Sequence, residues 1–123
     1  MIIIDYHDKR PIYEQIIDRF QTLILNGALE PDTQLPSVRS FAIELSINAN
    51  TIQRAYSELE RKGFIYSIKG RGSFVRQDNS LAEKQKAKTL AELCGQLKQC
   101  KEIGITQPEV IQCVNQIFME VSA

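Results

Sequence analysis

The sequence predicts a mainly α-helical fold that carries one small β-hairpin. Two stretches with apolar residues at helical spacing follow each other closely between Pro36 and Lys62. A glycine-tipped hairpin pattern comes directly after them, at 64–75, and two further helical patterns fill the chain beyond residue 80. Helix, turn, helix and hairpin in this order are typical of a winged helix-turn-helix. Polar and basic side chains stand where such a fold meets a DNA duplex.

The distribution of charge permits a nucleic-acid partner. The 123 residues include 15 basic and 15 acidic ones, so the formal net charge is zero. The stretch from Pro36 to Arg76, however, holds seven basic residues and only three acidic ones. Because cellular salt screens each charge beyond about 8 Å, a local basic face is enough to attract phosphates.

Composition also narrows the class of protein. No stretch approaches eighteen consecutive apolar residues, and the start is too short and too soon acidic for a signal peptide. Three cysteines without zinc-ligand spacing fit reduced thiols, so we expect a cytoplasmic protein with no membrane partner. The single histidine, His7, has only Asp5 and Asp8 beside it, and no catalytic motif is present. We therefore expect no enzyme activity, no cofactor and no metal site.

Local signals place the first two helices. Proline suits a first helical turn and Gly27 supplies a left-handed stop, so the first helix is expected over Pro11–Asn26. The residue before a proline avoids the helical region, which keeps the chain extended before the second helix. Ser37 can cap that helix, which is expected over Val38–Leu45.

A third helix, the recognition helix of the motif, follows after a turn of two residues. Either Asn48 or Asn50 can cap it, and its apolar spacing runs to about Lys62. The residues expected to face the core are Ile52, Ala55, Tyr56 and Leu59.

The wing is predicted from alternation and glycine placement. Residues 64–68 alternate at the strand period and residues 73–75 return after a short tip. Gly70 and Gly72 flank Arg71, and glycine accepts the positive φ that a tight hairpin needs. The tip can therefore carry Arg71 toward a phosphate or a neighbouring minor groove.

Beyond the wing the character of the chain changes, so we expect a DNA-binding domain over 1–77 and a second region over 78–123. A polar hinge at 77–80 is followed by a helix from about Leu81 to Ile103. Thr106 then begins a capping box for a last helix with one broad apolar face. These two helices form a two-helix C-terminal dimerisation hairpin in our interpretation.

The prediction of a dimer follows from the apolar surface of these two helices. Two helices cannot cover both apolar faces on each other, and about 300–600 Å² is already a large exposed patch for a monomer. A second copy of the hairpin would complete a four-helix bundle between subunits. The predicted interface residues are Leu90, Leu93, Leu97, Cys100, Val110, Val114, Ile117, Phe118 and Val121.

These motifs resemble the GntR family of bacterial transcription regulators, in particular its short YtrA-like subfamily. The similarity covers roughly Pro11 to Val75, and the tail fits a subfamily with a short two-helix C-terminal part. The motifs that carry it are Leu35-Pro36-Ser37-x-Arg39, Asn50-Thr51-x-x-Arg54-Ala55, Leu59-Glu60-x-x-Gly63 and Gly70-x-Gly72-x-Phe74-Val75. The resemblance implies a homodimer that binds a two-fold symmetric double-stranded DNA operator and usually represses a bacterial operon, often one next to transporter genes.

The resemblance also implies which residues touch DNA. Ala49 departs from the family, in which many members have a base-reading arginine at this position, and this affects which base pairs are read. Independently of the family, Asn50 and Gln53 are side chains that can pair bidentately with adenine in the major groove. The implied contacts are Arg39, Asn48, Asn50, Thr51, Gln53, Lys69, Gly70 and Arg71.

Several assignments keep alternatives. Ser37 is first a helix cap and a phosphate contact in addition, and Arg54 either contacts DNA or pairs with Glu58 one turn on. The whole domain could instead be a winged-helix protein-interaction module. A small-molecule effector, if one exists, would sit between subunits or at the hinge. The three cysteines are expected to be small buried hydrophobes, with a thiol switch at the dimer interface as the alternative; they are Cys94, Cys100 and Cys113.

Overall fold

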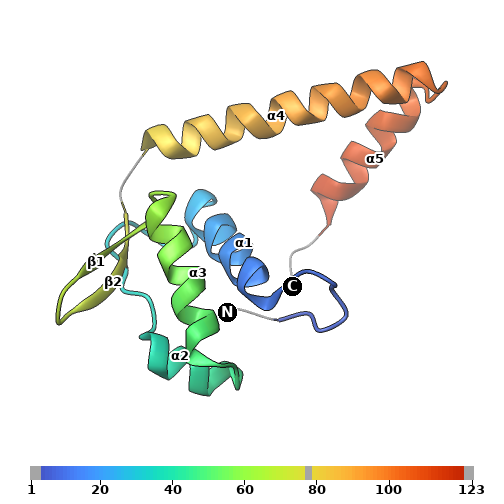
Figure 1. Cartoon of the computed structure of the whole chain (residues 1–123). Helices are drawn as coiled ribbons and strands as arrows, with labels where there is room; N and C mark the ends of the chain where they lie inside the picture. The colour runs from blue at the N-terminus through green and yellow to red at the C-terminus, as the bar shows by residue number, and fades with distance from the viewer. Residues whose placement is uncertain (1–3, 77–78, 121–123) are drawn as a thin grey trace. The chain divides into compact units, whose positions relative to one another are not determined.

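The computed structural model describes residues 4–76 and 79–120. The chain divides into two compact units, one ending at Ala82 and one beginning at Glu83, which we call the head and the tail. The elements are α1 (Ile12–Leu25), α2 (Val38–Leu45), α3 (Ala49–Arg61), β1 (Ile65–Ile68), β2 (Gly72–Val75), α4 (Asn79–Glu102) and α5 (Gln107–Met119) (Figure 1). The described part of the chain is thus mainly helical with one two-stranded antiparallel hairpin, as predicted.

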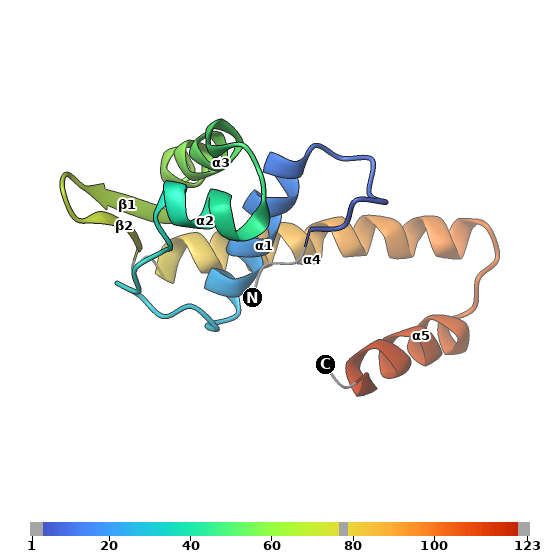
Figure 2. The ribbon, with the colours of Figure 1, turned by 90° about the horizontal axis from the view of Figure 1, so that it is seen from below.

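The head is built around α3. In Figures 1 and 2 the hairpin lies on one side of α3 and α1 on the other. Three aromatic rings join the helices: the Phe20 ring centroid lies 5.8 Å from those of both Phe41 and Tyr56. The buried apolar core is Ile16, Ile17, Phe20, Leu35, Phe41, Ala42, Ile52, Ala55, Tyr56, Leu59, Phe64, Ile65 and Val75.

The turn between α2 and α3 is tight. Ser46 adopts a left-handed conformation with φ 54°, which ends α2 without a glycine. The amide of Ile47 donates to the carbonyl of Ala42 at 3.0 Å, closing the turn. α3 then begins at Ala49, so the two helices form the predicted helix-turn-helix.

The wing has a third extended partner that the sequence analysis did not foresee. β1 and β2 pair in the register Ile65↔Val75 to Ile68↔Gly72. On the other edge of β2, the amide of Leu35 donates to the Ser73 carbonyl at 2.9 Å. The amide of Val75 donates to the Thr33 carbonyl at the same distance. The segment that leads into α2 is therefore fastened along the wing.

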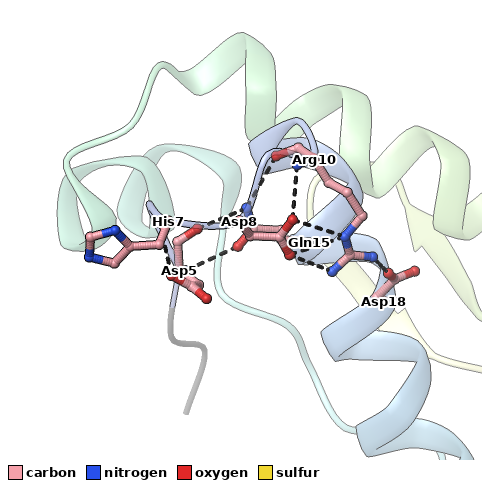
Figure 3. A network of polar contacts seen from close by, with 6 residues as sticks. All are labelled: Asp5, His7, Asp8, Arg10, Gln15 and Asp18. Carbon is pink, nitrogen blue, oxygen red and sulfur yellow. Dashed lines mark hydrogen bonds and ion pairs between the residues drawn. The ribbon is translucent and has the colours of Figure 1, made fainter.

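The chain before α1 is held by a buried glutamine. Gln15 is 8% exposed, and its Oε1 accepts from the amide of Asp5 at 3.0 Å. Its Nε2 donates to the carbonyls of Asp5 at 3.1 Å and Arg10 at 3.2 Å. The Arg10 guanidinium pairs with the carboxylates of Asp8 and Asp18 (Figure 3). Figure 3 shows the His7 imidazole pointing away from this network, and no metal-binding group of His, Cys, Asp or Glu occurs among the described residues.

The helix α4 begins earlier than predicted. Asn79 and Ser80, expected in a polar hinge, are helical, while the other two hinge residues lie outside the described ranges. Leu81, in the first turn of α4, is half-buried against the core of the head. Continuous helical hydrogen bonding and this apolar contact favour helix over an open linker here. The hinge was therefore predicted too long.

Each end of the tail turn matches its sequence signal. Gly104 takes φ 89° after α4, and the amide of Ile105 donates to the Cys100 carbonyl at 2.9 Å. The Thr106 hydroxyl accepts from the amide of Glu109 at 3.4 Å, which caps α5. No described helix is both long and apolar enough to cross a membrane.

The apolar residues of the tail remain exposed in the single chain. Phe118 is 85% and Leu90 is 62% exposed, whereas Cys100 and Val110 are half-buried. Cys94 and Cys113 are exposed as well, so the burial expected of these two cysteines does not occur within one chain. Val121, the last predicted interface residue, lies outside the described residues.

Candidate nucleic-acid interface

The helix α3 has one buried face and one polar exposed face. Its buried face is the predicted one, made by Ile52, Ala55, Tyr56 and Leu59. On the opposite face Asn50, Gln53 and Ser57 are all exposed. Because their spacing is three and four residues, they form one continuous stripe from the amino end of the helix. This is the part of a recognition helix that enters a major groove.

The structure decides which asparagine caps α3. The Oδ1 of Asn48 accepts from the amide of Asn50 at 2.8 Å, so Asn48 is the cap. The side chain of Asn50 is consequently exposed and not engaged in capping. The same bond occupies the Asn50 amide. Asn48 keeps its side-chain NH₂ as a donor.

Ser57 is a stripe residue that the sequence analysis missed. The Nε2 of Gln53 donates to its hydroxyl at 3.3 Å. Since a glutamine NH₂ group has two hydrogens, Gln53 can keep this bond while it offers a donor and an acceptor to a base. The signal that could have found Ser57 is its position four residues after Gln53.

Arg54 faces α1 instead of Glu58. Its guanidinium carbon lies 3.8 Å from the ring centroid of Tyr13, and its Nη2 donates to the Tyr13 hydroxyl at 3.1 Å. Glu58 forms its ion pair with Arg61 at 2.8 Å, and this hydrogen bonding lowers the pKa of the Glu58 carboxyl. The suggested pairing of Arg54 with Glu58 is therefore wrong: Tyr13 offers Arg54 a ring face and an oxygen, and Arg61 takes the carboxylate.

The start of α2 is capped as predicted. The Ser37 hydroxyl accepts from the amide of Ser40 at 3.0 Å and donates to the Ser40 hydroxyl at 2.8 Å. Arg39 is exposed in the first turn of the helix. The link to α3 is a partly buried hydrogen bond, in which the Tyr56 hydroxyl donates to the Pro36 carbonyl at 2.7 Å. Burial raises the pKa of Tyr56, so this hydroxyl stays a donor.

The wing tip has the geometry that its glycines suggested. Gly70 and Gly72 have φ 80° and 115°, and the Arg71 amide donates to the Ile68 carbonyl at 2.9 Å. Lys69 and Arg71 are exposed. The backbone at the tip has a further partner, because the Nε2 of Gln34 donates to the Arg71 carbonyl at 2.8 Å.

The predicted DNA contacts thus come from three segments of the head. The start of α2 supplies Ser37 and Arg39, the amino half of α3 supplies the stripe, and the wing supplies the tip. All ten predicted contact residues are exposed except Thr51, which is half-buried; they are Ser37, Arg39, Asn48, Asn50, Thr51, Gln53, Arg54, Lys69, Gly70 and Arg71.

Proteins of known sequence place this head in a family. The profile of the bacterial regulatory proteins of the gntR family matches residues 12–75. The transcriptional regulator YhcF of Bacillus subtilis is 38% identical over 108 residues, which cover 87% of this chain and 89% of that protein. The transcriptional repressor YtrA of the same organism is 45% identical over 78 residues, covering 63% of this chain and 60% of YtrA.

Solved structures agree with the sequence relatives. A GntR family transcriptional regulator from Listeria monocytogenes has a TM-score of 0.73 at 34% identity, covering 89% of this chain and 96% of that one. The DNA-binding domain of AraR in complex with its operator ORE1 has a TM-score of 0.51 at 25% identity, covering 61% and 92% of the two chains. These matches favour DNA binding over a protein-interaction module. The chain belongs to the GntR family of bacterial transcription regulators and carries the family's DNA-binding winged helix-turn-helix.

Proposed function

We propose that this protein is a homodimeric repressor that binds a two-fold symmetric DNA operator in the cytoplasm and controls a bacterial operon. The observation that carries the proposal is the exposed polar stripe of α3, together with the exposed Arg39 in the first turn of α2 and the exposed Arg71 at the wing tip. The naming of the relative YtrA as a repressor supports the direction of regulation. A transporter operon is the proposed target class.

The stripe supplies the base readout in this proposal. Asn50 and Gln53 each present a donor and an acceptor in the arrangement that adenine offers in the major groove. Arg39, Lys69 and Arg71 supply charge to phosphates, which positions the helix without reading sequence. The remaining predicted contacts, Ser37, Asn48, Thr51, Arg54 and Gly70, lie within the same three segments.

The tail supplies the two-fold symmetry. No residue of α5 is buried within the single chain, so a second tail is the simplest cover for its apolar face. A hollow of about 450 Å³ between α4 and α5, lined partly by Leu97, Cys100 and Val110, leaves room for side chains of that partner. The proposed interface residues are Leu90, Leu93, Leu97, Cys100, Val110, Val114, Ile117, Phe118 and Val121.

Fluorescence anisotropy with the full chain tests the DNA part of the proposal. The probes are the DNA upstream of the protein's own gene and a random duplex of equal length. Asn50→Ala and Gln53→Ala should each cost about 1–3 kcal/mol of discrimination between them, while Arg71→Ala should weaken binding to both. Gln21→Ala, a substitution on α1, is the matched control. Equal affinity of the wild-type chain for both duplexes would contradict sequence-specific binding.

Sedimentation equilibrium tests the dimer. The wild-type chain should sediment as a dimer at micromolar concentration, and Phe118→Glu should shift it to the monomer because a carboxylate would be buried unpaired. Asn115→Glu adds the same charge at an exposed polar position of α5 and serves as the control. A wild-type monomer under these conditions would remove the dimer from the proposal.

A further inference from the structure

Gln34 joins the wing tip to the segment that enters α2. It lies in the extended stretch beside β2, in a bridge with Phe74. Its Nε2 donates to the carbonyl of Arg71 at 2.8 Å, across 37 residues of sequence. Three residues after Gln34 the chain reaches Ser37, the cap of α2. One side chain thus ties two of the segments that supply the proposed DNA contacts.

Gly72, the residue after Arg71, leaves room for this bond. A Cβ atom at Gly72 would lie 3.1 Å from the Nε2 of Gln34, closer than ordinary van der Waals contact. Gly72 also has φ 115°, a conformation that residues with side chains rarely adopt. The glycine therefore serves both the hairpin and the approach of Gln34.

The bond restrains the tip of the wing, where two glycines flank Arg71. Arg71 stands between two glycines with positive φ, whose backbones lose the most entropy when they are fixed. Anchoring the Arg71 carbonyl fixes the backbone that carries the guanidinium before any DNA is met. Pre-organisation of this kind improves affinity by lowering the cost of ordering on binding.

A second bond holds the same segment at a different place. The Tyr66 hydroxyl donates to the Oδ1 of Asp32 at 2.7 Å, linking β1 to the stretch before Gln34. The Tyr66 and Phe74 rings stack with centroids 5.6 Å apart. These contacts do not involve the Gln34 side chain, so we expect the wing to stay folded when Gln34 is changed.

We propose that Gln34 is a positioning residue for DNA binding: it holds the wing tip so that Arg71 meets the duplex in a fixed place relative to α2. The proposal rests on the proposed function, in which Arg71 contacts DNA. Gln34 itself need not touch the duplex, because it acts through the Arg71 backbone.

The test replaces Gln34 by methionine, which has a similar length and no hydrogen-bonding NH₂ group. Gln34→Met should weaken binding to the upstream duplex about threefold to tenfold, the range expected for loss of one neutral hydrogen bond. The slope of affinity against salt should also become shallower, toward that of Arg71→Ala, because the guanidinium contact is less fully formed. In the free protein, the amides of 69–72 should exchange faster with deuterium.

A double-mutant cycle separates positioning from general destabilisation. If Gln34 acts through Arg71, Gln34→Met should have almost no effect on affinity in the Arg71→Ala background. Gln21→Met on α1 is the matched control and should bind like the wild type. Additive losses in the double variant, or wild-type affinity and exchange for Gln34→Met, would overturn the role of Gln34. A wild-type chain that fails to prefer the upstream duplex would instead overturn the proposed function. Faster exchange at 69–72 in Gln34→Met would in that case still support the role of Gln34 in holding the wing tip.

Discussion

Replacing Tyr56 by phenylalanine tests the bond that joins the recognition helix to the start of α2. Tyr56 is 4% exposed, and its hydroxyl donates to the Pro36 carbonyl at 2.7 Å. The substitution keeps the ring and its contacts with Phe20 and Phe41 while it removes one donor. The Pro36 carbonyl then loses its partner next to the cap of α2.

The expected loss in the free energy of unfolding follows from how deeply the bond between Tyr56 and Pro36 is buried. An acceptor left without a partner in a largely buried site costs about 1–3 kcal/mol, and Pro36 is itself half-buried, so we expect about 1–2 kcal/mol. For a cooperative unit the size of the head, 1 kcal/mol corresponds to about 4–8 °C in Tm. Tyr56→Phe should therefore lower the Tm of the head by about 4–16 °C, measured by circular dichroism.

The pH dependence gives a second signature. Burial raises the pKa of Tyr56 above its usual value of 10.0, so the folded head keeps the proton where the unfolded chain has lost it. The stability that the neutral hydroxyl contributes is fully present below about pH 10 and is lost as the pH rises toward the folded pKa. The wild-type Tm should fall more steeply above pH 10 than that of Tyr56→Phe, and the gap between them should narrow.

Tyr6→Phe is the matched control, because Tyr6 is 71% exposed. It should change the free energy of unfolding by less than about 0.5 kcal/mol. The reasoning is refuted if Tyr56→Phe unfolds at the wild-type temperature, or if the two proteins keep parallel Tm curves above pH 10.

Three further substitutions test other contacts of the head. Ser37→Ala removes the cap of α2 and should cost about 0.5–2 kcal/mol in urea unfolding; an unchanged midpoint would show that the cap contributes nothing. Gln15→Leu leaves the Asp5 amide without its partner and removes the Gln15 donor from the Asp5 and Arg10 carbonyls, so it should cost about 1–3 kcal/mol, with faster deuterium exchange at 5–10. Protection at the wild-type level would contradict a role of Gln15 in holding this segment. Tyr13→Leu removes the ring beneath Arg54 and should cost about 0.5–1 kcal/mol by thermal unfolding, whereas Tyr13→Phe keeps most of that contact; equal losses would argue against the stacking.

Structural features that depend on residues close together in the sequence were predictable from it. The bounds of α2 are the predicted ones, because a capping serine and a short apolar period define them locally. The hairpin was found for the same reason, from alternation and from the glycines at its tip. The choice between Asn48 and Asn50 as cap remained open, since an asparagine can cap at either position and only the backbone path decides.

Features that join distant residues were not predictable in this way. Gln34 and Arg71 are 37 residues apart, and Arg54 and Tyr13 are 41 apart. Helix spacing offered Arg54 only the nearby Glu58, whereas the packing of α1 against α3 placed the Tyr13 ring against the Arg54 guanidinium. The extended segment that pairs with the outer edge of β2 was missed because the short polar stretch before Leu35 has no strand alternation of its own.

The bare apolar faces of α4 and α5 make the proposed pairing sensitive to how much protein a cell contains. No residue of α5 is buried in one chain, so in the proposed dimer much of the folding free energy of the tail would come from the partner chain and would obey mass action. When most chains are unpaired, doubling their number raises the number of pairs about fourfold. A promoter controlled by the proposed dimer would respond to small changes in synthesis of its regulator more sharply than in proportion.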